Sequence, residues 1–95
     1  MGGYGGEKQL IESVEIICDE VMAIAFQEKK IHMSQKLNQL SEDQFKLSFK
    51  VPISYEFQRM IASYLPHIYE IQNEALRSEI IRNFTKALQT LKRAA

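Results

Sequence analysis

Glycine is missing from almost the whole of this chain. Its 95 residues include four glycines, and all four lie among the first six positions. A Gly-rich loop that holds a phosphate through backbone N–H groups is therefore excluded from the remainder. Turns there must be made by Asn, Ser, Asp and the two prolines. We interpret residues 1–6 as a flexible leader, either native or left from expression.

Cysteine and histidine are also scarce. Cys18 is the single cysteine, so no disulfide can form within the chain and no cysteine-based metal site is indicated. Its apolar neighbours predict a small buried side chain rather than a reactive thiol. We expect ordinary surface or half-buried histidines at His32 and His67, because two isolated histidines do not make a metal site. These absences predict a protein that is not an enzyme and needs no metal or cofactor.

Long apolar runs are absent as well. No segment reaches transmembrane length, and the first residues lack the basic and apolar regions of a signal peptide. We therefore expect a cytoplasmic protein that does not enter a membrane. The length suits one domain with a modest core, which dimerisation would help to stabilise.

The net charge is zero, but its sign divides the chain. Residues 1–45 carry eight acidic and four basic side chains, and residues 46–95 carry four acidic and eight basic ones. The second half therefore has a net charge of +4, which suits a polyanionic partner. The neutral total argues against strong non-specific binding of nucleic acid.

The segment 45–51 is the only one that alternates cleanly between apolar and polar residues. One side would hold apolar and the other polar residues, namely Phe45, Leu47, Phe49 and Val51 against Lys46, Ser48 and Lys50. This period of two predicts a strand with one buried face. The segments around it read as helical, so we expect the strand to pair with its copy in a second chain.

Residues 7–30 have apolar side chains every three or four positions, which predicts a helix. The apolar positions are Leu10, Val14, Ile17, Val21, Ile24 and Ala25, widened by four further apolar residues. Such a broad face indicates burial on two sides, against its own domain or against another protein. Residues 31–44 permit a short helix capped by Ser34, followed by a polar turn.

Two more helices are predicted after the strand. Ser54 can cap the first, which Pro66 should end or kink at Leu65. A helical pattern continues over 68–72, and Asn73 is a suitable break or cap. The last helix is predicted by a continuous apolar stripe, namely Leu76, Ile80, Phe84, Ala87, Leu88 and Leu91.

The order strand, helix, helix over residues 44–93 resembles the Arc- and MetJ-like ribbon–helix–helix family of DNA-binding proteins. Residues 44–47, Gln-Phe-Lys-Leu ahead of a proline, are similar to that family's strand, and residues 77–82, Arg-Ser-Glu-Ile-Ile-Arg, to the start of its second helix. The resemblance implies a mainly α chain with one short β-strand, forming an intertwined dimer. We accordingly divide the chain into a leader (1–6), an N-terminal helical extension (7–43) and a DNA-binding and dimerisation unit (44–95).

The resemblance also implies a set of site residues. In such dimers the paired strands enter the major groove and their outward side chains read base edges, which would make Lys46, Ser48 and Lys50 the base contacts. Backbone N–H groups near Arg77 and Ser78 would hold a phosphate. The dimer core would contain Leu47, Phe49, Val51, Ile80 and Phe84.

Two functions are predicted from these features. The first is a dimeric, sequence-specific DNA-binding protein, such as a repressor or an accessory factor of a plasmid, phage or conjugative element, which binds double-stranded DNA as a homodimer or higher oligomer. The alternative is a small all-helical interaction module, such as an adaptor, a chaperone or a phage-encoded inhibitor of a host protein. The apolar excess of residues 10–26 favours the alternative, because helix 7–30 could then dock a protein partner.

Overall fold

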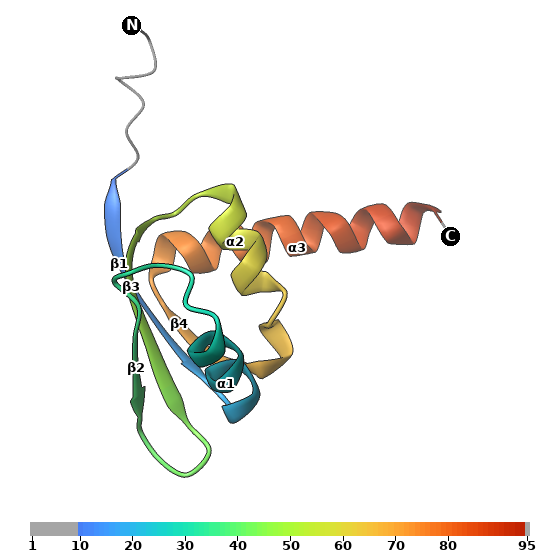
Figure 1. Cartoon of the computed structure of the whole chain (residues 1–95). Coiled ribbons are helices and arrows are strands. Elements are labelled where there is room, and N and C mark those ends of the chain that lie inside the picture. Colours follow the sequence, from blue (N-terminus) through green and yellow to red (C-terminus); the bar gives the residue numbers. More distant parts are fainter. Residues whose placement is uncertain (1–9, 95) are drawn as a thin grey trace, which may run out of the picture.

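The computed structural model describes residues 10–94, and Figure 1 shows a sheet with its helices gathered on one side. The elements in chain order are β1 (Ile11–Cys18), α1 (Glu20–Glu28), β2 (Lys36–Gln39), β3 (Phe45–Pro52), α2 (Tyr55–Ala62), the 3₁₀ turn η2 (Leu65–His67), β4 (Ile68–Gln72) and α3 (Glu74–Ala94). The predicted leader, residues 1–6, lies outside the described residues.

The four strands form one sheet in the order β2-β3-β1-β4, and every neighbouring pair is antiparallel. The chain order β1-α1-β2-β3-α2-β4, with β3 inserted between β1 and β2, is the ferredoxin-like, split β–α–β arrangement. Helix α3 is added after it. The prediction of a mainly α chain with one short strand is therefore wrong.

The expected intertwined dimer is wrong for the same reason. Strand β3 is confirmed as a strand, but both of its neighbours belong to its own chain: β1 pairs with it from Ile11 opposite Pro52 to Cys18 opposite Phe45, and β2 pairs on its other edge. A central strand has no free edge to offer to a second chain.

The helix predicted over residues 7–30 is, from Ile11 on, a strand followed by a shorter helix. Val14, Ile16 and Cys18 face the core with a period of two, which is the strand repeat. Asp19 has an extended backbone, and its carboxylate accepts a hydrogen bond from the N–H of Met22 at 3.2 Å. This N-cap starts α1.

Two other predicted helical segments are also strands. Residues 36–39 form β2 and residues 68–72 form β4, which pairs with β1. Ser34 does not cap a helix. Its hydroxyl accepts from the N–H of Lys50 at 2.9 Å and donates to the carbonyl of Lys50 at 3.2 Å. Ser34 thereby supplies hydrogen-bond partners for the backbone N–H and carbonyl of Lys50, at a position of β3 that the pairing with β2 does not reach.

The remaining helix signals are confirmed. The Ser54 hydroxyl accepts from the N–H of Phe57 at 3.0 Å and caps α2, while the Asn73 side chain accepts from the N–H of Leu76 at 2.8 Å and caps α3. Helix α2 ends at Ala62, before Pro66, which lies in η2. Pro66 has a fixed φ and no backbone N–H, so it cannot continue the α-helix and lies instead in the tighter 3₁₀ turn.

The core lies between the inward face of the sheet and the helices. A row of edge-to-face aromatic pairs crosses it, with ring centroids 5.2 Å apart for Phe26 and Tyr64, 6.1 Å for Phe26 and Phe49, and 5.4 Å for Phe49 and Phe57. Helix α3 buries only Leu76 and Ile80 in its first two turns. Its remaining length projects away from the body (Figure 1).

Candidate functional site

The three predicted base contacts lie together on the face of the sheet that carries no helix in the described chain. Lys46, Ser48 and Lys50 alternate with buried residues of β3, so they point away from the core. The register sets Lys36 and Asn38 of β2 beside them. We call this surface the open face; its residues are Ser13, Glu15, Ile17, Lys36, Asn38, Lys46, Ser48, Lys50, Glu70 and Gln72.

Hydroxyl and ammonium groups surround a shallow hollow of about 330 Å³ on the open face. Its polar lining comes from β1, β2, β3 and the loop before β2, namely Ser13, Glu15, Ser34, Lys36, Ser48 and Lys50. Lys46 stands beside it, with its Nζ 3.8 Å from Oε1 of Glu15. The hollow offers donors for an anion, and the two open-face carboxylates, Glu15 and Glu70, oppose that binding.

The predicted phosphate contacts lie elsewhere. Arg77 and Ser78 are exposed in the first turns of α3, and Arg77 lines a hollow with Tyr69 and Glu70 at the β4 edge. The structure therefore brings Lys46, Ser48 and Lys50 together, but it places Arg77 and Ser78 on a different part of the molecule.

Four of the five predicted dimer-core residues belong to this chain's own core. Leu47, Phe49, Val51 and Ile80 are buried among the helices and the sheet. Phe84 is different, because 52 % of its surface is exposed. Of that predicted set, Phe84 alone remains available to another molecule.

Two titratable groups meet where β1 joins α1. Nδ1 of His67 donates to the carboxylate of Asp19 at 2.9 Å. Burial would raise the pKa of Asp19, but the hydrogen bonds from His67 and from backbone N–H groups outweigh it and lower that pKa. Since Asp19 also caps α1, we assign this pair a structural role.

The neighbouring thiol, that of Cys18, is buried. Burial, helped by the negative charge of Asp19, raises the pKa of Cys18 to about 11, so the nucleophilic thiolate is suppressed at neutral pH. The predicted burial of Cys18 is confirmed. Within residues 10–94, no three His, Cys, Asp or Glu side chains are grouped so that they could hold a metal ion.

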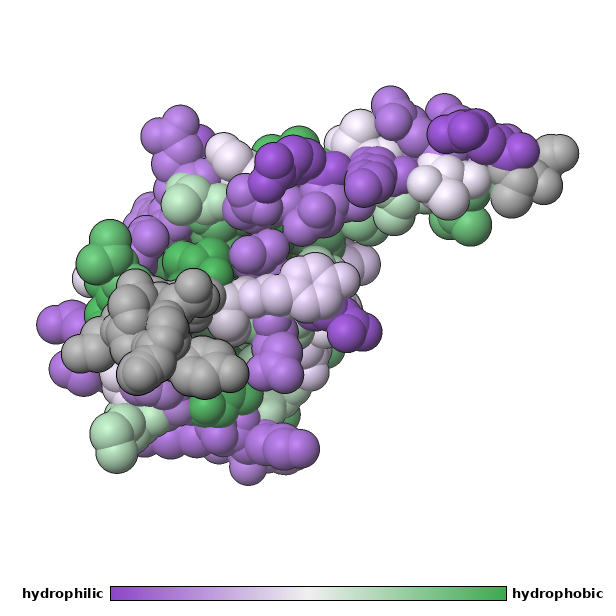
Figure 2. Space-filling view, turned by 90° about the horizontal axis from the view of Figure 1, so that it is seen from above, coloured by the Kyte–Doolittle hydropathy of each residue, from purple (hydrophilic) through white to green (hydrophobic). Residues whose placement is uncertain are grey.

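The most distinctive surface is the apolar stripe of α3 beyond Ile80. All residues from Ile81 to Arg93 are exposed. Four large apolar side chains among them lie at helical spacing, with exposed fractions of 58 % for Ile81, 52 % for Phe84, 46 % for Leu88 and 67 % for Leu91. Figure 2 shows hydrophilic residues along the other edge of the projecting helix. We call these four residues the α3 stripe.

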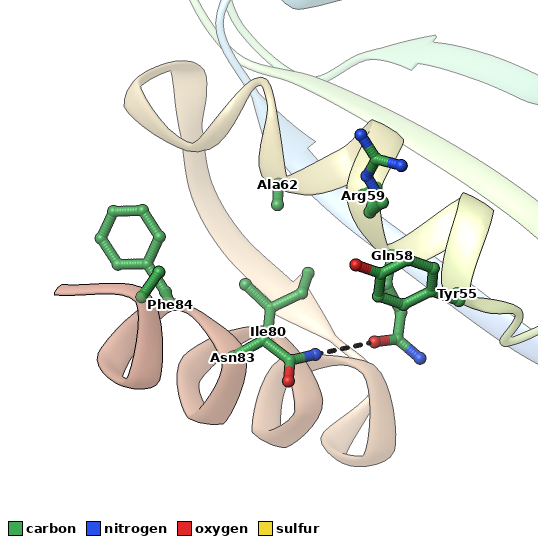
Figure 3. A pocket seen from close by; sticks show the side chains of 8 residues that line it. Tyr55, Gln58, Arg59, Ala62, Ile80, Asn83 and Phe84 are labelled. Carbon is green, nitrogen blue, oxygen red and sulfur yellow. Dashed lines mark hydrogen bonds between the residues drawn. The ribbon is translucent and has the colours of Figure 1, made fainter. Parts of the chain in front are cut away.

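A groove between α2 and α3 continues the stripe onto the body of the protein. It encloses about 160 Å³, and its lining residues are Tyr55, Gln58, Arg59, Ala62, Ile80, Asn83, Phe84 and Ala87. The side chain of Asn83 donates to Gln58 at 3.3 Å and closes one side, as Figure 3 shows. The guanidinium of Arg59 lies 5.7 Å from the centre of the Tyr55 ring.

The sequence predicted a docking surface on residues 7–30. The apolar excess of residues 10–26 lies largely in the core, because Val14, Ile16, Cys18, Met22 and Phe26 are buried. The spacing of the α3 stripe could be recognised in the sequence, but the exposure of its side chains could not be predicted from it. The α2 side of the groove, including Tyr55 and Ala62, was missed, and no sequence signal joined it to α3.

Comparison with protein-family models, with curated proteins and with solved structures gives no match. The ferredoxin-like arrangement carries many unrelated functions, so the fold alone does not indicate one. In the described part of the chain, none of the helices has the length and apolar content needed to cross a membrane.

Proposed function

We propose that this protein is an interaction module that binds another protein surface through the α3 stripe. The observation that carries the proposal is the exposure of Ile81, Phe84, Leu88 and Leu91 on one side of a helix that projects from the body. Single exposed apolar residues are common, but a contiguous apolar patch typically marks a binding surface.

The anatomy of α3 supports this function. Helix α3 is anchored by Leu76 and Ile80, whereas the thirteen residues from Ile81 to Arg93 contribute no buried side chain. Anchors repeated at intervals of three, four and three residues are the spacing by which an amphipathic helix seats in a groove or against another helix. The adjoining α2–α3 groove would widen the contact.

Site-specific photo-crosslinking tests the proposal. We would introduce a photo-reactive phenylalanine analogue at Phe84 and, as a control, at Gln89 on the polar side of α3, in cells that express the full chain. The expected result is a protein adduct from position 84 and little or none from position 89. An absence of adducts from position 84 would contradict the proposed function.

A second candidate is binding of DNA on the open face, favoured by the grouping of Lys36, Lys46 and Lys50 around serine hydroxyls. This binding would use phosphate contacts on a helix-free sheet surface and needs no strand from a second chain. Affinity should therefore fall as the salt concentration rises.

The second candidate is tested by anisotropy titration of duplex DNA. Replacing Lys36, Lys46 and Lys50 with alanine should abolish binding, whereas replacing Lys29, Lys30 and Lys86, which removes the same charge elsewhere, should leave most of it. Equal losses in the two triple variants would mean that only the total charge matters, and the open face would not be the site.

A further inference from the structure

We propose that the occupant of the α3 stripe is a second copy of this chain, with the two α3 helices antiparallel across a two-fold axis near Lys86. This inference rests on the proposed function and names its partner. Each helix would cover the stripe of the other, and each helix end would reach the α2–α3 groove of the other copy. Such an arrangement closes on itself as a dimer.

The stripe is close to symmetric about that axis. An antiparallel pair centred on residue 86 sets Phe84 opposite Leu88 of the second copy, and Ile81 opposite Leu91. Every large apolar side chain that the helix exposes beyond Ile80 then meets another one. From Ile81 to Leu91 the helix rises about 15 Å, and this whole length lies outside the core.

The charged side chains of α3 lie off the stripe, so the contact between two copies would be apolar. At about 100° per residue, Glu79, Lys86 and Arg93 are on the side of the helix away from the stripe. Antiparallel packing opposes the two helix dipoles, whereas parallel packing aligns them.

The α2–α3 groove gives the end of the partner helix a place to bind. In the antiparallel pair, Leu91 of the second copy comes level with Ile80 and Ile81, where Ala62 and Tyr55 of α2 form the facing side (Figure 3). The groove and the stripe would thus be covered together, and twice per dimer because of the two-fold axis.

The mass in solution tests self-association directly. Light scattering over a range of concentrations should show a dimer for the full chain. The double variant Phe84→Glu/Leu88→Glu should raise the dissociation constant by at least about tenfold, because it places charges in the apolar contact. The control Gln89→Glu/Thr90→Glu makes the same charge change on the side of α3 away from the stripe, and it should remain dimeric.

Disulfide crosslinking tests the orientation. When Ile81→Cys and Leu91→Cys chains are mixed and oxidised gently, antiparallel packing predicts a disulfide between the two different variants, and little within either variant alone. Disulfides of each variant with itself would show parallel packing and overturn the proposed orientation. Cys18 is buried in both chains, and circular dichroism checks that each variant is folded.

The outcomes separate this inference from the proposed function. A monomer at all concentrations, together with a crosslink from Phe84 to a different protein, overturns self-association and keeps the interaction module. A monomer without any crosslink from Phe84 overturns both. A crosslinked product of twice the chain mass, together with a light-scattering dimer that Phe84→Glu/Leu88→Glu dissociates, supports both.

Discussion

Asp19 shows how much one side chain can organise in a small domain. One carboxylate oxygen caps α1 through the N–H of Met22, and the other accepts from His67. Its own N–H donates to the carbonyl of His67 at 2.9 Å. The residue therefore joins the start of α1 to η2, two segments 48 positions apart in the sequence.

Replacing Asp19 should lower stability in a pH-dependent way. Asp19→Ala removes the cap and should cost roughly 1–2 kcal/mol at pH 7. Because the pKa of Asp19 is lower in the folded state, its charge stabilises the fold above the unfolded pKa of about 4 and stops doing so as the pH falls through the folded pKa. Urea unfolding from pH 7 to pH 2 measures this. Asp19→Asn, which keeps a capping oxygen, should lose less stability below pH 4 than the wild type does. If the stabilities of the wild type and of Asp19→Asn fell in parallel as the pH is lowered, the stabilising role of the Asp19 charge would be contradicted.

Gln35 is the buried polar residue that ties α1 to the following loop. Its side-chain amide donates to the carbonyl of Phe26 at 2.8 Å, and its side-chain oxygen accepts from the N–H of Ile31 at 3.0 Å. Gln35→Ala leaves both backbone groups without these partners and should cost roughly 1–3 kcal/mol. Urea unfolding measures the loss. Gln27→Ala, an exposed change in α1, should stay within about 0.5 kcal/mol of the wild type, and equal losses would argue against a specific role for Gln35.

At the scale of elements, the sequence predicted α2 and α3 well and β1 badly, for a physical reason. Leu10, Val14, Ile17 and Val21 are spaced as on a helix, but Ile17 points to the open face while Val14 faces the core. A strand partly covered on both sides loses its clean alternation and imitates a helical stripe. Asp19 as an N-cap was the available signal that a new element begins there.

Strand β3 was recognised, but its partners were not. Strands β2 and β4 have four and five residues, which is too short for a period of two to stand out against chance. Because β1 was predicted as a helix, the sequence offered no partner for β3 within the chain. This is why pairing with a second chain was predicted. The open-face side chains of β3 were still placed together correctly, because alternation is local.

The candidate site on α3 was only partly predictable from the sequence. The apolar pattern from Leu76 to Leu91 could be recognised in the sequence, but the point where the core ends, after Ile80, depends on how α2 and β4 pack against the helix. The apolar periodicity of a helix does not show which part of its apolar side the rest of a small domain can bury.

The end of α3 should contribute little to the stability of a single chain. Ending the chain at Lys86 removes no side chain that the structure shows to be buried, so unfolding of dilute, monomeric protein should change by about 0.5 kcal/mol or less. Ile80→Ala should instead cost roughly 2–5 kcal/mol, because Ile80 is buried in the core. Urea titrations of both variants check this contrast. A large loss on truncation would show that residues 87–94 stabilise the body itself.

At the scale of the whole molecule, the two candidate surfaces are separate. The open face lies on the helix-free side of the sheet, whereas α3 projects from the opposite side (Figure 1). A dimer formed through α3 would leave both open faces uncovered. If these faces bind DNA, two linked copies would raise the effective concentration of the second face, so monomeric variants should bind DNA less tightly without any change in the face itself.

Dimerisation should also make thermal stability depend on concentration. Because association occurs between folded chains, mass action raises the melting temperature as protein is added. For a chain of this length, a hundredfold increase above the dissociation constant should raise Tm by roughly 5–10 °C. Differential scanning calorimetry measures this shift. Phe84→Glu/Leu88→Glu should melt at one temperature over the whole range, whereas Gln89→Glu/Thr90→Glu should follow the wild type. A wild-type Tm that stays constant while light scattering shows a dimer would mean that association does not require the folded helix, which contradicts packing through α3.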